Sequence, residues 1–231
     1  MVQKRKKRPF LKKNTYELQA WAQERLVCGI DEVGRGCLAG PVVTAAVILP
    51  QNCSYRLLKD SKEMSGEERL LAYKWIKRNC WYGVGIVHHR AVDTHNVWHA
   101  TLIAMRKAVM HLLAVSPHRP SCFVVDAMPL KLHGHAYADI PVHHFPFGEK
   151  KSSSIAAASI LAKVRRDAMM SRMHDQFPHF AWHTNKGYGT KEHKSALKDH
   201  TKTILHRVSY LENLTLEQKE DTDGDHQQRI C

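Results

Sequence analysis

The stretch from Leu26 to Leu49, LVCGIDEVGRGCLAGPVVTAAVIL, constrains the fold of this chain more than any other. Two apolar runs flank a glycine-rich turn, a pattern that predicts a hairpin-like pair of strands. The first run ends on Asp31 and Glu32, and acids at the end of a buried strand are costly without a positive partner such as a divalent cation. The turn Gly34-Arg35-Gly36 lets the backbone approach a ligand and direct N–H groups at it. Together these features indicate metal-assisted chemistry on a phosphate ester.

Charge and composition narrow the class of partner and the compartment. The 231 residues carry a formal net charge of +13, which favours polyanions, although an unspecific excess of lysine is the plain alternative. No apolar run approaches the ~18 residues of a membrane span, and the basic N-terminus lacks the apolar segment of a secretory signal. Six scattered cysteines are typical of reduced thiols rather than of a disulfide frame or a zinc site. We therefore expect a cytoplasmic protein without a membrane role.

Hydrophobic periodicity predicts an α/β fold, a mixed sheet flanked by helices. Ser65 and Glu68 form a capping-box pattern at the start of one helix. We expect helices over 15–25, 67–79, 89–114 and 150–177, and strands over 26–30, 42–49, 81–89, 121–128 and 142–148. The expected organisation is a basic flexible arm (1–14), a catalytic domain (15–180), a C-terminal helical extension (181–215) and a disordered tail (216–231).

Four acids are placed to meet at one edge of this sheet. Asp31 and Asp126 each end an apolar strand, and Glu149 follows a third. Ligand sites gather at the carboxyl ends of strands in open α/β sheets, so these acids and Glu32 would converge if the strands are neighbours. Oxygen-rich clusters bind Mg²⁺ or Mn²⁺ rather than zinc, and two such ions support phosphodiester hydrolysis. For Glu149 alone, a solvated strand end is an equally good interpretation.

Basic and aromatic side chains near these motifs are candidate contacts to a nucleic acid. Lys62 lies in a polar Asp-Ser-Lys loop, and Lys150, Lys151 and Lys163 precede or lie on the helix that follows Glu149. A single lysine is more often only a surface charge and contributes little specificity. Tyr188 lies between two glycines, a position that favours stacking on a sugar or base over burial in a core.

Five motifs, in order and spacing, give the chain a resemblance to bacterial ribonuclease HII: GIDEVGRGCLAGPVV, LKDSKEMS, VVDAM, SIAAASILAKVRRDAM and NKGYGTKEH. The similar segment runs from about Val27 to His193. The resemblance implies an RNase H-like fold with a C-terminal helical extension, and a monomer. It also implies hydrolysis of RNA in RNA–DNA hybrids and incision 5′ of single ribonucleotides embedded in duplex DNA. The sister family, ribonuclease HIII, typically lacks the arginine of the Gly-Arg-Gly turn, so Arg35 favours the HII type.

The resemblance also implies roles for individual residues. Asp31, Glu32 and Asp126 would be metal ligands, and Glu149 stands where the family usually has aspartate. The Gly-Arg-Gly turn would sense the ribose 2′-hydroxyl, which distinguishes RNA from DNA. Tyr188 would pack on the sugar at the RNA–DNA junction. The substrate contacts would be Gly34, Arg35, Gly36, Asp60, Ser61, Lys62, Lys163 and Tyr188.

Two departures and two rival functions accompany this interpretation. Cys37 replaces the usual proline after Gly-Arg-Gly and is expected to loosen the turn, and the longer Glu149 puts the second metal position in question. Asp167 is expected to form a structural ion pair with a neighbouring basic residue rather than to be the fourth acid. The rivals are a non-catalytic RNA-binding protein, which leaves the acids unexplained, and another DNA nuclease of the same fold, which leaves the Gly-Arg-Gly and Gly-Tyr-Gly loops unexplained.

Overall fold

A five-stranded mixed sheet forms the centre of the protein in a computed structural model that describes residues 13–132, 137 and 139–212. The strand order is β3-β2-β1-β4-β5. β1, β2 and β3 pair antiparallel, whereas β4 and β5 run parallel to β1. The strands are β1 (Val27–Val33), β2 (Val42–Ile48), β3 (Trp81–Val87), β4 (Cys122–Asp126) and β5 (Val142–Phe145). The expected mixed α/β sheet is confirmed.

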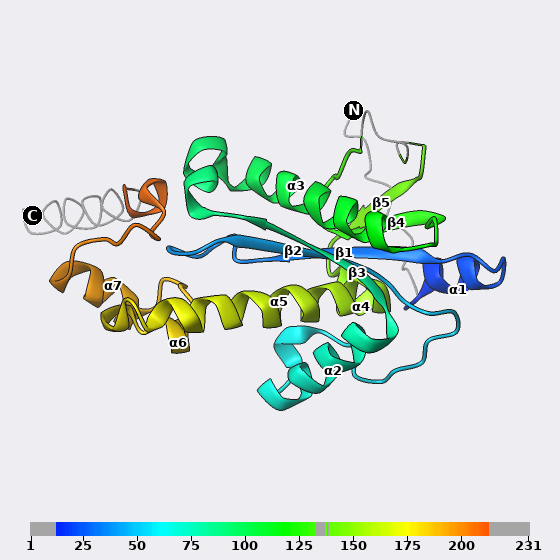
Figure 1. The fold of residues 1–231 in the computed structure, drawn as a ribbon, viewed down its shortest axis with the longest axis horizontal. Helices are drawn as coiled ribbons and strands as arrows, with labels where there is room; N and C mark the ends of the chain where they lie inside the picture. The colour runs from blue at the N-terminus through cyan, green and yellow to red at the C-terminus, as the bar shows by residue number, and fades with distance from the viewer. Residues whose placement is uncertain (1–12, 133–136, 138, 213–231) are drawn as a thin grey trace, which may run out of the picture.

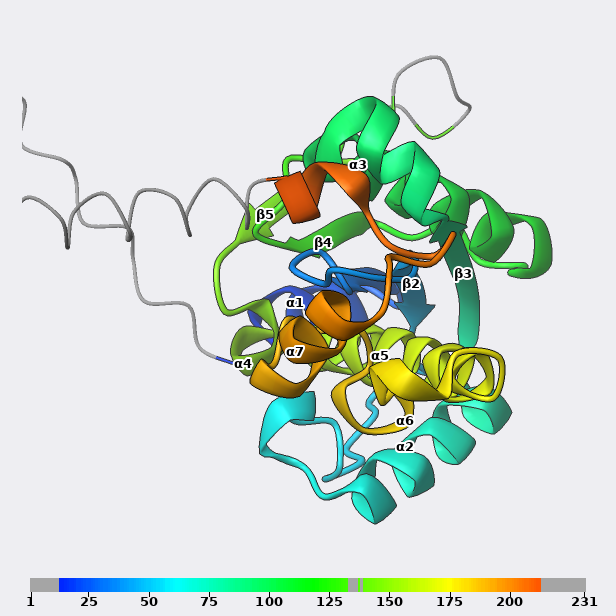
Figure 2. The same ribbon diagram turned by 90° about the vertical axis from the view of Figure 1, so that its left-hand side faces the viewer.

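Helices cover both faces of this sheet. α3 packs on one face against β2 and β3, and α5 packs on the other against β1 and β2 (Figure 1). α2 lies on the outer side of α5, so the end-on view shows four layers (Figure 2). The helices are α1 (Thr15–Trp21), α2 (Gly66–Asn79), α3 (His89–Val115), α4 (Gly148–Lys151), α5 (Ser153–His174), α6 (Trp182–Asn185) and α7 (Lys191–Asp199), with short 3₁₀ turns η1 (Ser61–Glu63) and η2 (Pro178–Phe180).

Close approach of α3 to the sheet depends on two glycines of β3. A Cβ added at Gly83 would lie 2.1 Å from the carbonyl oxygen of Ala108, and one at Gly85 would lie 1.9 Å from that of Ala104. Only hydrogen fits at either position, so α3 packs directly on the backbone of β3. The β2 strand between the two helices is buried along its whole length.

The start of α5 is fixed by α1. Glu17 is buried, and its carboxylate accepts hydrogen bonds from the Ser152 hydroxyl and, at 3.1 Å, from the Ser154 amide. The Asn14 side chain accepts another from the Ser153 amide at 2.8 Å. A carboxylate at a helix N-terminus satisfies free amide groups and complements the helix dipole. α1 therefore holds the helix that forms one wall of the site described below.

Several element boundaries differ from the sequence prediction. β1 extends to Val33, so Asp31 and Glu32 lie within this strand rather than after it. The first helix ends at Trp21 rather than at residue 25, and β5 ends at Phe145, before a proline that cannot donate to the sheet. The long helix α3 breaks at Asn96, whose φ is 58° and whose side chain caps the second part through the His99 amide. The helix predicted from residue 150 is divided at Ser152, whose hydroxyl caps α5.

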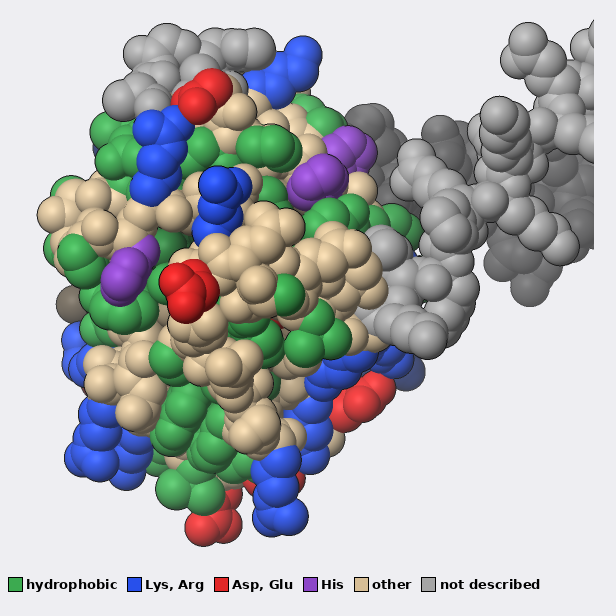
Figure 3. Space-filling model, turned by 90° about the vertical axis from the view of Figure 1, so that its right-hand side faces the viewer, with side chains coloured by type: hydrophobic (Ala, Val, Ile, Leu, Met, Phe, Trp, Pro, Cys, Tyr) green, Lys and Arg blue, Asp and Glu red, His purple; other side chains and the backbone are tan. Residues whose placement is uncertain are grey.

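Other predictions hold or lie outside the described residues. The capping box of Ser65 and Glu68 is present at the start of α2. Most of the predicted basic arm and all of the predicted tail from residue 216 fall outside the described residues. Within the described chain, no helix combines the length and apolar character needed to cross a bilayer. The end of the molecule that carries α1 displays Lys and Arg side chains, some of them beside Asp or Glu, on a largely uncharged surface (Figure 3).

Candidate active site

The carboxyl ends of three parallel strands bring the predicted acids together. The pairing of β1 with β4 places Ile30 opposite Val125, so Asp31 and Asp126 follow on neighbouring strands. Asp126 in turn lies opposite Phe145 of β5, and Glu149 follows in the first turn of α4. The expected convergence of the strand-end acids is therefore observed.

These acids line a cleft of about 280 Å³, which we call the acid cleft. Side chains from the sheet edge, the η1 loop, α5 and the Gly-Tyr-Gly loop form its wall. The lining residues are Asp31, Glu32, Val33, Asp60, Ser61, Lys62, Asp126, Glu149, Ser159, Lys163 and Tyr188. The cleft thus gathers the four predicted metal ligands and most of the predicted substrate contacts, with Asp60 as a fifth carboxylate.

Burial and mutual repulsion disfavour the charged forms of the acids on β1. Burial raises the pKa of Asp31 well above its usual value, and the carboxylates of Glu32 and Asp126 raise it further. Burial also raises the pKa of Glu32 to about 7, with Arg35 opposing and Asp126 adding to the shift. Glu32 Oε2 is buried and has no hydrogen-bond partner among the described residues. The positive charge of Arg35 only partly offsets the burial of Glu32.

A hard divalent cation fits this set of side chains. Burial raises the pKa of Glu149 as well, and Asp126 and Asp60 contribute to the shift. Carboxylates only accept hydrogen bonds, so like-charged neighbours cannot satisfy one another, whereas Mg²⁺ and Mn²⁺ prefer such oxygen ligands. Among the described residues, no three His, Cys, Asp or Glu side chains are already arranged to enclose an ion.

Hydrogen bonds from the surrounding chain fix two of the acids. The Asp31 carboxylate accepts a bond from the Glu32 amide at 2.7 Å and another from the Ser159 hydroxyl. The Ser159 hydroxyl is also 3.0 Å from that of Ser61, so it connects the η1 loop to the cleft. Asp126 accepts a bond from the Gly148 amide at 2.8 Å. The sequence analysis missed Ser159, which the serines and alanines around it in α5 do not distinguish.

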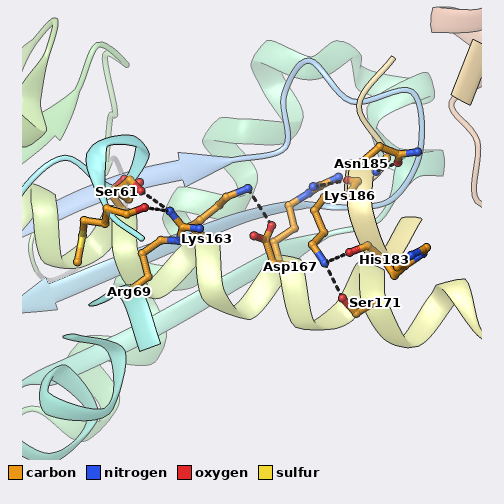
Figure 4. A network of polar contacts seen from close by, with 12 residues as sticks. Ser61, Arg69, Lys163, Asp167, Ser171, His183, Asn185 and Lys186 are labelled. Atoms are coloured by element: carbon orange, nitrogen blue, oxygen red, sulfur yellow. Dashed lines mark hydrogen bonds and ion pairs between the residues drawn. The ribbon is translucent and has the colours of Figure 1, made fainter. Parts of the chain in front are cut away.

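The basic side chains predicted to contact phosphate divide into two groups. Lys62 and Lys163 line the acid cleft. Lys163 also pairs with Asp167 at 2.9 Å, one turn further along α5 (Figure 4), which confirms the structural ion pair expected for Asp167. Lys150 instead pairs with exposed Glu63 at 3.1 Å, and neither it nor its neighbour Lys151 lines the cleft.

The Gly-Arg-Gly turn lies beside the cleft rather than in its wall. Gly34 has a φ of +94°, a conformation that favours glycine. The Arg35 guanidinium is 3.3 Å from Glu32 Oε1, and it lies 5.9 Å from the centre of the exposed Trp98 ring. Gly36 is exposed. The turn therefore adjoins a predicted metal ligand while keeping one open side.

The Gly-Tyr-Gly loop packs against the segment that follows this turn. Cys37 is fully buried and forms an isolated β-bridge with Tyr188. The Tyr188 side chain keeps 39% of its surface exposed and lies 5.8 Å from Lys163 Nζ and 5.7 Å from the Arg166 guanidinium, measured to the ring centre. Burial raises the pKa of Tyr188 to about 12, with Cys37 adding to the shift, so the hydroxyl stays protonated. The exposed aromatic position expected for Tyr188 is observed.

Two fully buried arginines, which sequence analysis did not single out, hold this region together. Arg207 donates to the carbonyl oxygens of Gly34, Arg35 and Gly40 at 2.6 to 3.2 Å. Arg166 donates to those of Ala39, Pro41 and Lys186 at 2.8 to 3.1 Å. We call the two guanidinium groups and these carbonyl groups the arginine frame. No side-chain pattern could reveal it, because the partners are main-chain atoms distant in sequence.

Comparison with known proteins identifies similar chains over most of this length. A sequence model of the family described as Ribonuclease HII matches residues 28–213. Ribonuclease HII of Lactobacillus delbrueckii subsp. bulgaricus is 42% identical over 207 residues, 89% of this chain and 77% of that protein. The PCNA:RNase HII complex from Archaeoglobus fulgidus contains a similar structure, with a TM-score of 0.61, 25% identity, and coverage of 75% of this chain and 87% of that one. Bst-RNase HIII in complex with Mn²⁺ shares the fold at a TM-score of 0.57 and 20% identity, covering 79% and 73%.

Proposed function

This chain belongs to the ribonuclease HII family, and on that premise we propose that the acid cleft holds two divalent metal ions and cuts nucleic acid at a ribonucleotide. As a member of the family, the protein is a hydrolytic, metal-dependent endonuclease of the ribonuclease H type and acts on RNA-containing nucleic acid. The more specific proposal names the residues, the metal and the substrate. The observation that carries it is the convergence of five carboxylates in one cleft, one of them with a buried oxygen that has no hydrogen-bond partner in the described part of the chain.

The proposed ligands are Asp31, Glu32, Asp126 and Glu149, and the proposed metal is Mg²⁺ or Mn²⁺. When bound, the ions would supply water activation and stabilisation of the leaving oxygen. The chain supports this arrangement because hydrogen bonds from the Glu32 amide and the Gly148 amide already orient Asp31 and Asp126. Glu149 lies in the first turn of α4 rather than at the end of β5, and its longer side chain would reach the ion from there.

The remaining residues are proposed to bind and orient the substrate. Lys62 and Lys163 face the acid cleft and would contact phosphate oxygens. The Gly-Arg-Gly turn beside Glu32 would recognise the ribose 2′-hydroxyl, and the half-exposed Tyr188 ring would pack on the adjoining sugar. The η1 loop residues Asp60 and Ser61 would position Lys62, since the Asp60 carboxylate accepts a hydrogen bond from the Lys62 amide at 2.9 Å. Cleavage would leave 3′-hydroxyl and 5′-phosphate ends.

We propose that RNA–DNA hybrids and duplex DNA with single embedded ribonucleotides are the substrates, and that a monomer in the cytoplasm acts on them. Five cysteines within the described residues are free thiols, which supports a reducing compartment. Light scattering of the purified protein would test the monomer, because a dimer would double the apparent mass.

The decisive experiment is cleavage of a labelled DNA duplex carrying one ribonucleotide, with Mg²⁺, with Mn²⁺ and with chelator. We expect a metal-dependent cut on the 5′ side of the ribonucleotide, and no cut in the matched all-DNA duplex. Cleavage of continuous hybrids without cleavage at the single ribonucleotide would overturn the proposed substrate. Cleavage of the all-DNA duplex would instead support a DNA nuclease of the same fold.

A further inference from the structure

The Gly-Arg-Gly turn is held from behind by the last described segment of the chain. Arg207 is fully buried and donates to the carbonyl oxygens of Gly34 at 2.6 Å and Arg35 at 2.7 Å. The Tyr210 hydroxyl donates a second bond to the Arg35 carbonyl oxygen at 2.7 Å. Arg207 also bonds the Gly40 carbonyl oxygen at 2.9 Å. Both peptide groups at the centre of the turn are therefore fixed through their oxygens.

The geometry of the peptide bond sets the direction of the matching amide groups. In a planar trans peptide, the C=O and N–H bonds point in opposite directions. Anchoring the Gly34 and Arg35 carbonyl groups on Arg207 thus directs the amides of Arg35 and Gly36 away from it. Neither amide donates to another described residue, and a Cβ added at Gly36 would meet nothing within 4 Å. Both N–H groups are therefore without a partner among the described residues, and the turn is open at Gly36 beside the acid cleft.

The buried charge behind the turn strengthens these donors. No carboxylate lies within ion-pair distance of Arg207 among the described residues, so its charge acts on the carbonyl groups that it contacts. A hydrogen bond to a carbonyl oxygen polarises the whole peptide group and makes its N–H a better donor. Bonds from a charged donor are also stronger than neutral ones. The open side of the turn thus suits a hydroxyl or phosphate oxygen.

The segment that carries Arg207 is itself anchored to α3 and to the turn. The Asp93 carboxylate accepts bonds from the Val208 amide at 3.0 Å and from the Ser209 amide at 3.1 Å. The Arg207 amide donates to the Leu38 carbonyl oxygen at 2.8 Å. These contacts fix the segment around Arg207 relative to α3 and to the residues that follow the turn.

We propose that Arg207 and Tyr210 are positioning residues that hold the Arg35 and Gly36 amide groups in place to recognise the ribose 2′-hydroxyl of the substrate. The inference rests on the proposed function of the Gly-Arg-Gly turn. It assigns the C-terminal segment a part in choosing the substrate, in addition to its part in the fold.

The test compares binding of two duplexes that differ by one hydroxyl. In a cleavage-deficient Asp126→Asn background, fluorescence anisotropy with Mg²⁺ gives Kd for a DNA duplex with one ribonucleotide and for the all-DNA duplex. The Kd of the all-DNA duplex divided by the Kd of the ribonucleotide-containing duplex measures ribose discrimination. We expect Tyr210→Phe, which removes one hydrogen bond, to lower this ratio about fivefold and Arg207→Lys to lower it further, while all-DNA binding stays unchanged.

Matched controls separate positioning from general loss of structure. Arg106→Lys alters an arginine that donates to the Lys131 carbonyl oxygen, away from the turn and the acid cleft, so it should keep the ratio. Tyr55→Phe controls for loss of a tyrosine hydroxyl away from the turn. Tyr210→Phe keeps the test informative if Arg207→Lys does not fold.

The outcomes distinguish this inference from the proposed function. Equal affinity of the background protein for both duplexes would mean that the turn does not read the ribose, and the proposed function would fail. Discrimination by the background protein that persists in folded Tyr210→Phe and Arg207→Lys would overturn the positioning role alone. An equal loss of affinity for both duplexes in these variants would also overturn it, since it would reveal a purely structural contact.

Discussion

Two adjoining regions of this protein bury charge in opposite ways. In the arginine frame, Arg166 and Arg207 are fully buried, and their N–H groups meet carbonyl oxygens. In the acid cleft, carboxylates face one another, and Glu32 Oε2 has no partner in the described chain. A guanidinium presents several donors that main-chain carbonyls can satisfy, whereas a carboxylate only accepts. The frame is therefore complete without a ligand, and the cleft is completed only by a cation.

The largest expected effect comes from removing one charge of the acid cleft. Asp126→Asn should lower cleavage at least ~10³-fold, because the cation loses a ligand that stabilises the transition state. The fold should persist, since an asparagine oxygen can still accept the Gly148 amide. Without metal, differential scanning fluorimetry should show an unchanged or raised melting temperature, because the repulsion among the carboxylates falls. Added Mn²⁺ should raise the melting temperature of the variant less than that of the parent protein.

Asp139→Asn is the matched control for this change, since Asp139 is exposed and pairs with Arg119 outside the cleft. Retained cleavage by Asp126→Asn would show that the cleft is not the catalytic centre. Loss of both folding and activity would make Asp126 a structural residue, and the contrast between the two regions would disappear.

The rigidity of the arginine frame can be tested by adding one methyl group. Gly34→Ala should destabilise the protein by about 3 kcal/mol, because φ is +94° and the new Cβ would lie 2.2 Å from Arg166 Nε. Gly36→Ala, two residues further along, should leave the free energy of unfolding unchanged, since a Cβ there meets nothing within 4 Å. Urea unfolding of both variants measures the difference. Equal free energies of unfolding for the two variants would mean that the arginine frame can shift and does not fix the turn.

The C-terminal segment also depends on two neutral histidines. The Thr203 amide donates to His206 Nδ1 at 2.9 Å, and the Trp182 indole donates to His193 Nε2 at 3.3 Å. His193 Nδ1 donates to the Tyr188 carbonyl oxygen at 2.9 Å, so the single lone pair of His193 Nε2 is shared between the Trp182 indole and His206 Nε2, which lies 3.0 Å away. All four ring nitrogens are used, so an added proton breaks one of these bonds.

Acidification should therefore weaken the protein through this pair. Burial lowers the pKa of His206 from 6.5 to about 4, and the nearby His193 and His89 contribute, while Thr203 opposes the shift. Because the folded form prefers neutral imidazole, its contribution is complete above pH 6.5 and is lost as pH falls towards 4. Between pH 8 and pH 5, this amounts to about 2 kcal/mol of unfolding free energy.

His206→Gln provides the comparison, because the glutamine amide does not titrate. The carboxyl groups of the acid cleft titrate in both proteins, so they do not contribute to the difference between them. Urea unfolding at pH 8 and pH 5 should show a smaller loss on acidification in this variant than in the parent protein. An identical loss in both proteins would locate the acid sensitivity elsewhere and would remove the histidine pair from the account of the C-terminal segment.

The sequence anticipated the acid cleft better than the arginine frame, and the reason is physical. Asp126 ends β4, and Asp31 lies near the carboxyl end of β1, so the parallel alignment of these neighbouring strands brings the acids together. The partners of Arg166 and Arg207 are main-chain carbonyls, which every residue carries and no residue type marks. The break of α3 at Asn96 was missed for a related reason, because neither glycine nor proline marks it.

The smallest expected effect tests whether a carboxylate near the acid cleft takes part in cleavage. Asp167→Asn makes the same chemical change as Asp126→Asn, but Asp167 already has a cation, Lys163, at 2.9 Å on the same helix face. With side-chain exposures of 24% and 22%, this i,i+4 pair should contribute about 0.5 kcal/mol or less. Cleavage of the single-ribonucleotide duplex should stay within about twofold of the parent rate, since Asp167 does not line the cleft. A loss comparable to that of Asp126→Asn would instead make Asp167 a metal ligand. The distinction between the paired carboxylate of Asp167 and the carboxylates of the acid cleft would then be wrong.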